Sequence, residues 1–516
     1  MRNSKYPSVI KNTVILYFRT LLVLLLGLFS TRLALSFLGN ENFGIVNVVN
    51  SVVTLSYFLH SALIAMSQRY LTFAVGKGEL EQLAYTLKNI LFLHCCVAFG
   101  IVVILESVGL CFVTKELNIP AAQKSAALIV YHTWVGVACC TLLQIPWQSL
   151  LIAYEKMDLF ASVTVFEAVL KIALLSGMFF FEGNRLILYV AAIFITSVLI
   201  FFTYCVIGKI LIGKNTTSKG RVDRSMLISM SGFSSWYLLG GIAFYFMFQG
   251  GNILVNLFFG TLVNAAMGIA FQIYGALSAF SGNIRQAIEP RIVKNFASGN
   301  NQMMTDNTFI GARYTFYLLF IFILPGLVDV DAALKLWLSS PPPQAALFCS
   351  FIMIFVLFQS FDLAFASIFK ATGQVKENQI YSAVIYLLTL PVTYVLFKIG
   401  MPVIFMFFIQ VTAAFIVGLV IKFLLMSKVL GVSMKYYFQH LLKPLLKTLF
   451  PCLIPIGIVI VFLPPGLFRG IVHGICLTLT MVFSCLYLDL EKKQRQIVLS
   501  KLYEVLNRFH HKEKNI

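Results

Sequence analysis

Glu167 and Lys171 are two ionisable residues four positions apart in the middle of an apolar stretch, residues 159–182. In a helix they share one face, and an acid placed N-terminal to a base favours pairing. Ionisable groups at membrane depth cost a few kcal/mol each and usually serve a function. We therefore expect the pair to face a cavity, with Glu167 coupling an ion and Lys171 binding substrate. A neutral pair that only aids insertion or packing is the alternative.

Arginines in apolar stretches are candidates for binding phosphate. Arg32 lies in the stretch 13–38, about 9 Å from its outer end at the rise of a helix. A guanidinium stays charged and can hold phosphate oxygens through two parallel hydrogen bonds, so Arg32 suits a pyrophosphate. Snorkelling to the outer headgroups is the alternative for Arg32. For Arg19, nearer the inner end, snorkelling is the better interpretation.

A third group lies near the inner end of the eighth apolar stretch, where Arg285 and Glu289 are four residues apart. They could form a local salt bridge; the sharper hypothesis is that Arg285 captures substrate from the inner leaflet. Asp362, in the tenth stretch, has no partner nearby in the sequence. With Glu167 and Glu289 it is a candidate site for a coupling proton or sodium ion.

Two polar stripes follow helical spacing in otherwise apolar segments. The first is Asn47, Asn50 and Thr54, and the second is Gln249, Asn252 and Asn256. Their amides could line an aqueous path and bind sugar hydroxyls, which makes Asn47, Asn50, Asn252 and Asn256 candidate substrate-binding residues. Hydrogen bonding between helices is the alternative.

Catalytic motifs are missing from the sequence. It contains neither a G-x-x-x-x-G-K-[ST] phosphate loop nor an H-E-x-x-H zinc motif, and its ten cysteines have no C-x-x-C spacing. The loops between apolar stretches are too short for a catalytic domain. We expect no enzyme activity, no metal and no cofactor.

The composition predicts the elements that position these residues. Of 516 residues, 59% are hydrophobic and 11% charged, whereas soluble domains carry roughly 25% charged residues. This excludes a soluble enzyme and predicts an all-α polytopic membrane protein of about 14 spans. The expected spans are 13–38, 43–73, 83–113, 123–153, 159–182, 185–212, 226–258, 264–290, 309–337, 345–370, 379–398, 402–426, 444–463 and 468–488.

The net charge of +19 reflects the orientation of the chain in the membrane and is not interpreted as a sign of nucleic-acid binding. Cations cluster in the even-numbered loops, such as residues 209–224, and in the tail 489–516, so the positive-inside rule predicts cytoplasmic termini. The apolar start is too long for a signal peptide and predicts an uncleaved first span. The tail is expected to form a basic surface helix, with an apolar stripe of Val498, Leu502, Val505 and Phe509.

An internal repeat organises the chain. Phe37-Leu38-Gly39 parallels Phe258-Phe259-Gly260, and Arg69 to Gly76 parallels Arg291 to Gly299, offset by 221 to 223 residues. The offset spans six helices, and an even number of membrane crossings gives both repeats the same orientation in the membrane. Such parallel repeats are typical of transporters. The expected parts are an N-terminal lobe (1–212), a basic cytoplasmic linker (213–225), a C-terminal lobe (226–426) of six helices like the first, two additional spans (427–488) and the tail (489–516).

These segments resemble the polysaccharide (O-antigen type) flippases of the multidrug/oligosaccharidyl-lipid/polysaccharide exporter superfamily. The resembling stretches are FLGNENFGIVNVVNSV (37–52), SQRYLTFAVGKGE (67–79), GGNILVNLFFGTLVNAAMGIAFQI (250–273), NIRQAIEPRIVKNFASGN (283–300) and KATGQVKENQ (370–379). The resemblance covers residues 8–430 and implies two six-helix lobes that alternate between inward- and outward-open states. Two positions depart from it: Met267 replaces an arginine common in relatives, and Glu289-Pro290-Arg291 replaces N-P-Q.

The resemblance implies a flippase that moves an undecaprenyl-pyrophosphate-linked oligosaccharide across the bacterial cytoplasmic (inner) membrane by alternating access. The expected partners are this lipid-linked sugar, membrane lipids and a coupling proton or sodium ion, with no nucleic acid. A drug/cation antiporter of the same superfamily is one alternative, although the first span has two arginines and no acid. A membrane-embedded polysaccharide polymerase is the other, although a long outer loop is missing.

Overall fold

The computed structural model describes residues 5–213, 222–233, 235–338, 340–490, 495–496 and 500. Within this part the ordered elements are all helices, with no strand. The apolar stripe predicted for the tail lies outside the described residues, as do residues 214–221 of the predicted linker. The α-helices are α1 (Lys5–Thr54), α2 (Phe58–Lys77), α3 (Leu80–Ile104), α4 (Leu110–Lys115), α5 (Lys124–Ala153), α6 (Met157–Gly177), α7 (Arg185–Ile212), α8 (Arg224–Phe233), α9 (Ser235–Tyr245), α10 (Gly251–Phe259), α11 (Thr261–Ala297), α12 (Asn301–Val328), α13 (Val330–Trp337), α14 (Ala345–Ala371), α15 (Val375–Lys398), α16 (Ile404–Phe415), α17 (Lys422–Leu430), α18 (Met434–Tyr437), α19 (Lys443–Phe462) and α20 (Leu467–Ser484).

Short segments of tighter or wider helix join several of these elements. The 3-10 turns are η1 (Leu55–Tyr57), η3 (Ala121–Gln123) and η4 (Met178–Phe180). The π-helical turns are η2 (Leu105–Gly109), η5 (Phe246–Gly250), η6 (Ile416–Ile421), η7 (Phe438–Leu442) and η8 (Cys485–Asp489). Each π turn holds an extra residue and redirects the side chains that follow it, which is why such turns are frequent at functional sites.

Thirteen helical segments of the described residues are long and apolar enough to cross a membrane. The first, Phe18–Lys77, has 60 residues, about 90 Å of helix, which suffices for two crossings of a hydrocarbon core about 30 Å thick. The chain is therefore an all-α multi-pass membrane protein. The fourteen predicted spans correspond to these segments when the first is counted twice.

Glycine breaks the long helices at equivalent places in the internal repeat. Gly39 interrupts α1 at φ 74° and ψ 170°, and Gly260 separates α10 from α11 at φ 81° and ψ 179°. Gly78 and Gly299, at φ 75° and 74°, end α2 and follow α11. Both pairs are 221 residues apart, so Gly78 rather than Gly76 is the structural counterpart of Gly299. Only glycine adopts such positive φ values without strain.

The chain divides into two compact units, each continuous in space but not in sequence. Unit 1 comprises residues 1–279, 337–355 and 374–417, and unit 2 comprises 280–336, 356–373 and 418–516. The divisions fall inside α11, α13, α14 and η6 and between α14 and α15. Unit 1 therefore contains the predicted N-terminal lobe together with parts of the C-terminal one, and the lobe boundaries at 212 and 226 stay a prediction.

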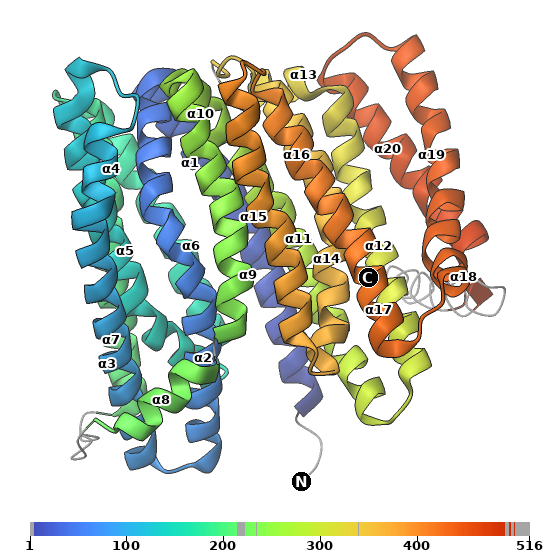
Figure 1. The fold of residues 1–516 in the computed structure, drawn as a ribbon, viewed down its shortest axis with the longest axis horizontal. Coiled ribbons are helices and arrows are strands. Elements are labelled where there is room, and N and C mark those ends of the chain that lie inside the picture. Colours follow the sequence, from blue (N-terminus) through green and yellow to red (C-terminus); the bar gives the residue numbers. More distant parts are fainter. Residues whose placement is uncertain are drawn as a thin grey trace, which may run out of the picture. The chain divides into compact units, whose positions relative to one another are not determined.

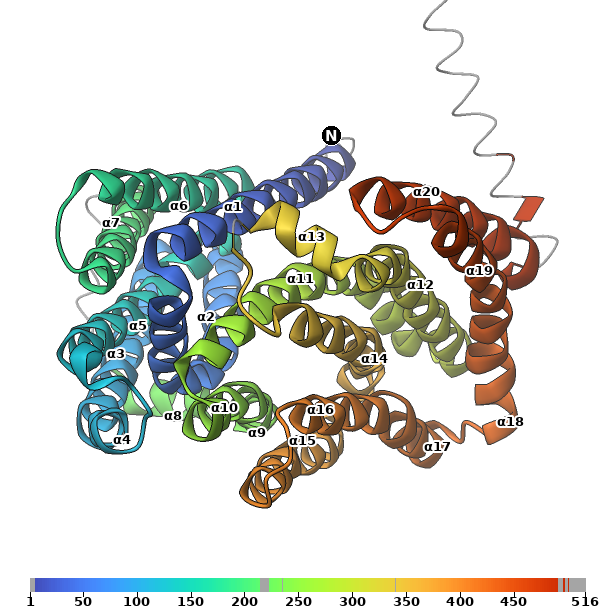
Figure 2. The same cartoon turned by 90° about the horizontal axis from the view of Figure 1, so that it is seen from above.

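Within each unit the helices pack in pairs, and several of these pairs join parts of the chain that are far apart in the sequence. In unit 1, α1 packs on α6, α5 on α7, and α15 on α9 (Figures 1 and 2). In unit 2, α19 packs on α20 and α20 on α12 (Figure 2). These pairs set which ionisable side chains can meet.

Candidate functional site

One cluster of ionisable residues in unit 1 joins α1 to α6. The Arg19 Nε donates a hydrogen bond of 2.7 Å to the Thr164 Oγ1, and the guanidinium carbon lies 4.6 Å from the centre of the Phe160 ring. Arg19, for which the sequence predicts snorkelling, is therefore held against α6. Glu167, on the same helix, interacts electrostatically with both Arg19 and Lys171.

Glu167 and Lys171 do not form the direct ion pair that their spacing predicts. Both side chains are half-buried, and no contact within 4.0 Å joins the carboxylate to the ammonium group. The carboxylate instead lies in the field of two cations, Arg19 and Lys171. This cluster carries one acid against two bases, so its net charge is positive.

Arg32 lies on an exposed part of α1. Among the described residues it has no hydrogen-bond or ion-pair partner. Arg32 and the cluster around Arg19 are thus two cationic places in unit 1.

The predicted amide stripes come together as a buried hydrogen-bond network in unit 1. Asn252 is fully buried, and its amide donates to the Asn47 Oδ1 at 2.5 Å and to the Ser51 Oγ at 2.7 Å. The Asn264 amide donates to the Asn252 Oδ1 at 2.8 Å, and the Asn256 amide donates to the Asn264 Oδ1 at 3.0 Å. These contacts favour the interhelical interpretation of the stripes over an aqueous path.

Asn50 differs from the other amides, because its Oδ1 is buried and accepts no hydrogen bond from the described residues. An unsatisfied buried carbonyl costs about 1–3 kcal/mol. Of the four predicted amides, Asn50 alone has a side-chain oxygen that accepts no hydrogen bond from the described residues.

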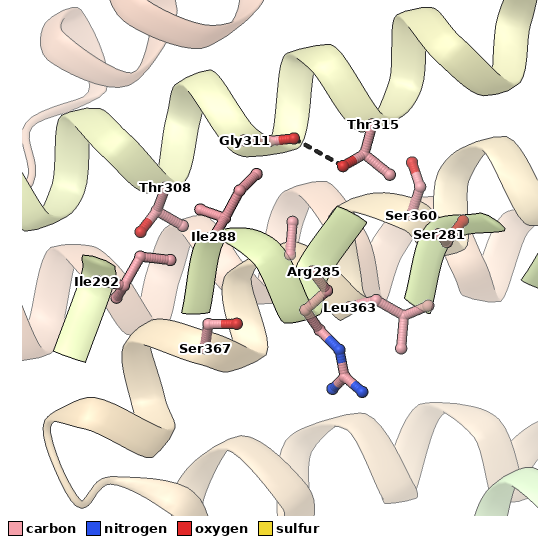
Figure 3. Close-up of a pocket in the computed structure, with 11 residues that line it drawn as sticks. Ser281, Arg285, Ile288, Ile292, Thr308, Gly311, Thr315, Ser360, Leu363 and Ser367 are labelled. Atoms are coloured by element: carbon pink, nitrogen blue, oxygen red, sulfur yellow. Dashed lines mark hydrogen bonds between the residues drawn. The ribbon is translucent and has the colours of Figure 1, made fainter. Parts of the chain in front are cut away.

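Arg285 lines a small pocket in unit 2, formed by α11, α12 and α14. Buried hydroxyl residues surround it, and they are Ser281, Thr308, Thr315, Ser360 and Ser367. The Arg285 Nε is buried and donates to no described group. Figure 3 shows the side chain extending from α11 on the side away from Gly311 and Thr315. The pocket is thus lined by small polar side chains, and the guanidinium group of Arg285 extends away from the Gly311 and Thr315 side of it.

The local salt bridge predicted between Arg285 and Glu289 is not formed. The Glu289 carboxylate instead pairs with the ammonium group of Lys370, near the end of α14. Lys370 reaches across from the neighbouring helix, which the sequence spacing cannot reveal. As a result Arg285 keeps its charge without a carboxylate partner.

Asp362 has a partner that the sequence analysis missed. Its Oδ1 lies 2.6 Å from the Nζ of Lys422, whose side chain is fully buried. Lys422 follows the π turn η6, where Gly418 packs so closely that an added Cβ would lie 2.6 Å from the Phe358 carbonyl oxygen. The sequence did contain one signal for this partner, namely that Lys422 is a lysine within an otherwise apolar span.

Two further ion pairs in unit 2 were also missed, and both join α12 to the last span. Arg469, near the start of α20, donates to the Asp329 carboxylate, with the shortest contact at 2.6 Å. Arg313 lies 3.1 Å from Asp489 in η8, whose side chain is completely buried. Their partners are more than a hundred residues apart, so neighbouring sequence gave no indication of them.

Several cations within the spanning segments of the described residues have no acid to themselves. The acids Glu289, Asp329, Asp362 and Asp489 each pair with a cation. Arg32 and Arg285 have no carboxylate partner, and Arg19 shares one acid with Lys171. Within each unit, the guanidinium and ammonium groups can attract an anion. In the described ranges no cluster of three or more metal-ligating side chains occurs.

Comparison with solved structures places this fold among transporters. One match is the lipid II flippase MurJ in an inward-closed conformation, with a TM-score of 0.60 and 11% identity over 92% of this chain and 98% of that chain. Another is an inward-facing multidrug resistance MATE family transporter of the MOP superfamily, with a TM-score of 0.60 and 11% identity over 80% and 96%. An outward-facing MATE transporter matches with a TM-score of 0.58 and 13% identity over 82% and 96%.

Neither a protein-family model nor a curated protein sequence matches the chain. At 11–13% identity the likeness is one of fold. The chain therefore shares the fold of these MATE and MurJ transporters.

Proposed function

We propose that this protein is a flippase for a lipid-linked oligosaccharide, the undecaprenyl-pyrophosphate-linked repeat unit expected of an O-antigen type family member. The observation that carries the proposal is the surplus of cations at membrane depth. Arg32 and Arg285 lack carboxylate partners among the described residues, whereas Glu289, Asp362 and Asp489 have cationic ones. An unpaired ionisable group at membrane depth is costly and usually serves a function, such as binding a ligand that neutralises it.

The chemistry of the surplus charges fits a pyrophosphate. Arginine presents a planar fork that holds two phosphate oxygens at once, and Arg285 has buried hydroxyl residues beside it. Hydroxyl groups also bind the sugar part of such a cargo. The isoprenoid chain stays in the bilayer, so only the head group has to cross the membrane.

Transport is driven by an ion gradient in this proposal, with Glu167, Asp362 and Glu289 as the candidate coupling acids. Glu167 lies in the field of Arg19 and Lys171. Asp362 pairs with Lys422, and Glu289 pairs with Lys370. Protonation of such an acid releases its cation, which links proton binding to the electrostatics of the substrate site.

A drug/cation antiporter is the second candidate, because the chain shares its fold with MATE transporters as well as with MurJ. A cationic drug needs unpaired acids in its path. The paired state of Glu289, Asp362, Asp329 and Asp489 disfavours this candidate.

Deletion of the gene, followed by analysis of lipid-linked sugars, tests the proposal. We expect lipid-linked repeat units to accumulate on the cytoplasmic leaflet of the inner membrane and surface polysaccharide to disappear, with recovery on complementation. Unextended repeat units on the outer leaflet would instead indicate a polymerase. Normal polysaccharide together with raised sensitivity to cationic drugs would indicate the antiporter. Reporter fusions at both termini test the proposed cytoplasmic orientation.

A further inference from the structure

Unit 1 contains a large apolar pocket whose lining has no ionisable side chain. Its volume is about 390 Å³, and its walls come from three parts of the chain: the end of α1 with η1 and α2, the end of α3 with η2, and η5 with α10. Val52, Leu105 and Ile253 are buried side chains of these three walls.

The polar groups at the pocket wall are already bonded within the protein. The Ser56 hydroxyl donates to the Val53 carbonyl at 2.7 Å. The Leu105 carbonyl accepts from the Tyr131 hydroxyl at 2.5 Å, an approach that requires Gly109, since a Cβ there would lie 2.3 Å from the Tyr131 oxygen. Water in such a pocket would find too few hydrogen-bond partners to be stable.

The size of the pocket calls for an apolar occupant. An engineered apolar cavity of about 150 Å³ in a soluble protein stays dry and binds small hydrocarbons, and this pocket exceeds that volume more than twofold. At its rim, Ile104 and Val108 are 61% and 68% exposed. Both belong to a membrane-spanning segment, Leu80–Lys115, so a chain can enter sideways without leaving hydrocarbon.

The position of the pocket along the helices can be compared with that of Arg32, because both are fixed relative to the break at Gly39. Arg32 precedes the break at Gly39 by seven residues, and Val52 follows it by thirteen. At the helical rise these positions lie about 10 Å and about 20 Å along the two arms of the break. A phosphate held at the depth of Arg32 therefore has the first part of its chain at the level of the pocket. A bulk phospholipid, whose phosphate stays at the membrane surface, would bring only the end of its chain there.

We propose that this pocket binds the isoprenoid chain of the lipid-linked cargo. The inference rests on the proposed function and extends it, because it assigns the hydrocarbon part of the substrate to a place in unit 1. The pocket holds the chain while the pyrophosphate is bound by cationic side chains, which orients the carrier for transport of its head group.

Native mass spectrometry tests this on the full-length chain, taken from nanodiscs of phosphatidylethanolamine and phosphatidylglycerol that contain undecaprenyl phosphate. We expect the unmodified chain to retain undecaprenyl phosphate and Ser56→Trp, which fills the pocket, to retain at least tenfold less. Ser36→Trp is the matched control, since Ser36 is an exposed serine of α1 with the same kind of bond to its own helix. Val52→Phe serves as a second filling variant if Ser56→Trp does not give a monodisperse protein.

Two outcomes would overturn the inference. Equal retention of undecaprenyl phosphate by a folded filling variant and by Ser36→Trp means that the chain binds elsewhere. A parallel loss of phospholipid and undecaprenyl phosphate means that the pocket holds bulk lipid. The measurement needs neither sugar nor translocation, so its failure is distinct from that of the proposed function, which the deletion strain reports.

Discussion

Asp362 and Lys422 form an ion pair of 2.6 Å between α14 and α17, and the lysine side chain is completely buried. Taking both charges out of water is expensive, so such a pair is usually worth little relative to well-packed apolar residues. Removal of one partner, however, leaves a buried charge uncompensated. The stability of unit 2 should therefore depend strongly on keeping both partners of this pair.

Single replacement of either partner is predicted to destabilise the protein. Lys422→Met and Asp362→Leu should each lower the free energy of unfolding by about 3–5 kcal/mol. The double variant should recover most of the loss, because it removes both charges. Denaturant unfolding in detergent measures the effect, with Lys428→Met at an exposed position of the same helix as the control. Equal losses in the single and double variants would contradict a pairwise origin.

Arg285→Ala is predicted to reduce surface polysaccharide at least tenfold while leaving membrane insertion intact. A hydrogen bond to a charged group contributes about 1.5–3 kcal/mol, and 1.4 kcal/mol corresponds to a factor of ten. Arg291→Ala, at an exposed position of the same helix, should leave polysaccharide unchanged. Arg32→Ala and Lys171→Ala should also lower export; full export in all three variants would refute the site assignment.

The last span should detach from α12 when its ion pairs are removed. Asp489→Asn leaves Arg313 buried without a countercharge and should cost about 3 kcal/mol. Asp329→Asn removes the partner of Arg469 at the other end of α20. Hydrogen exchange of α20 should accelerate in both variants. It should stay at the wild-type rate in Asp331→Asn, whose carboxylate is exposed.

Asn252→Leu should affect stability rather than substrate recognition. It removes two donated hydrogen bonds and the acceptor for Asn264, for a loss of about 1–3 kcal/mol. Asn42→Ala is the control, because the Asn42 amide donates to the Leu38 carbonyl four residues earlier, across the break at Gly39, and not to another span. Polysaccharide export per folded molecule of the Asn252→Leu variant should match that of the unmodified protein. A selective loss of export at normal stability would return Asn252 to the substrate site.

The start of α8 should respond to acid. The hydroxyl and the backbone amide of Ser225 hydrogen-bond to the Asp223 carboxylate and lower its pKa below the ordinary 3.8. A carboxyl group with a depressed pKa in the folded state stabilises above its unfolded value, and this contribution is lost as the pH falls through the lowered pKa. The protection factor of the Ser225 amide, which is the exchange rate of an unstructured amide at the same pH divided by its own, should therefore fall only in strong acid. In Asp223→Ala the protection factor should be low at every pH.

The sequence predicted the membrane-spanning helices because long apolar stretches with few charges can satisfy their backbone hydrogen bonds within a bilayer only as helices. The internal repeat was also visible, since glycine at positive φ is required by the backbone alone. Gly39 and Gly260 were matched correctly, while Gly76 was chosen in place of Gly78 because a helix end cannot be located to within two residues.

The partners of the charged residues could not be predicted in the same way. Arg285 and Glu289 have the spacing of a local pair, yet Glu289 pairs with Lys370 from α14. Helical spacing describes neighbours on one helix, whereas buried charges are matched between helices. Similarly, Asn47 and Asn252 each looked like part of a water-facing stripe, and the structure brings the two stripes against each other.

The π turn η6 has an evolutionary consequence. A π turn arises when one residue is inserted into an α-helix, and the insertion rotates everything beyond it by about 100°. Lys422 follows directly after η6, so its direction toward Asp362 depends on that inserted residue. A relative that lacks the insertion would direct this lysine away from the aspartate. The insertion, the aspartate and the lysine should therefore be gained and lost together across descendants of a common ancestor.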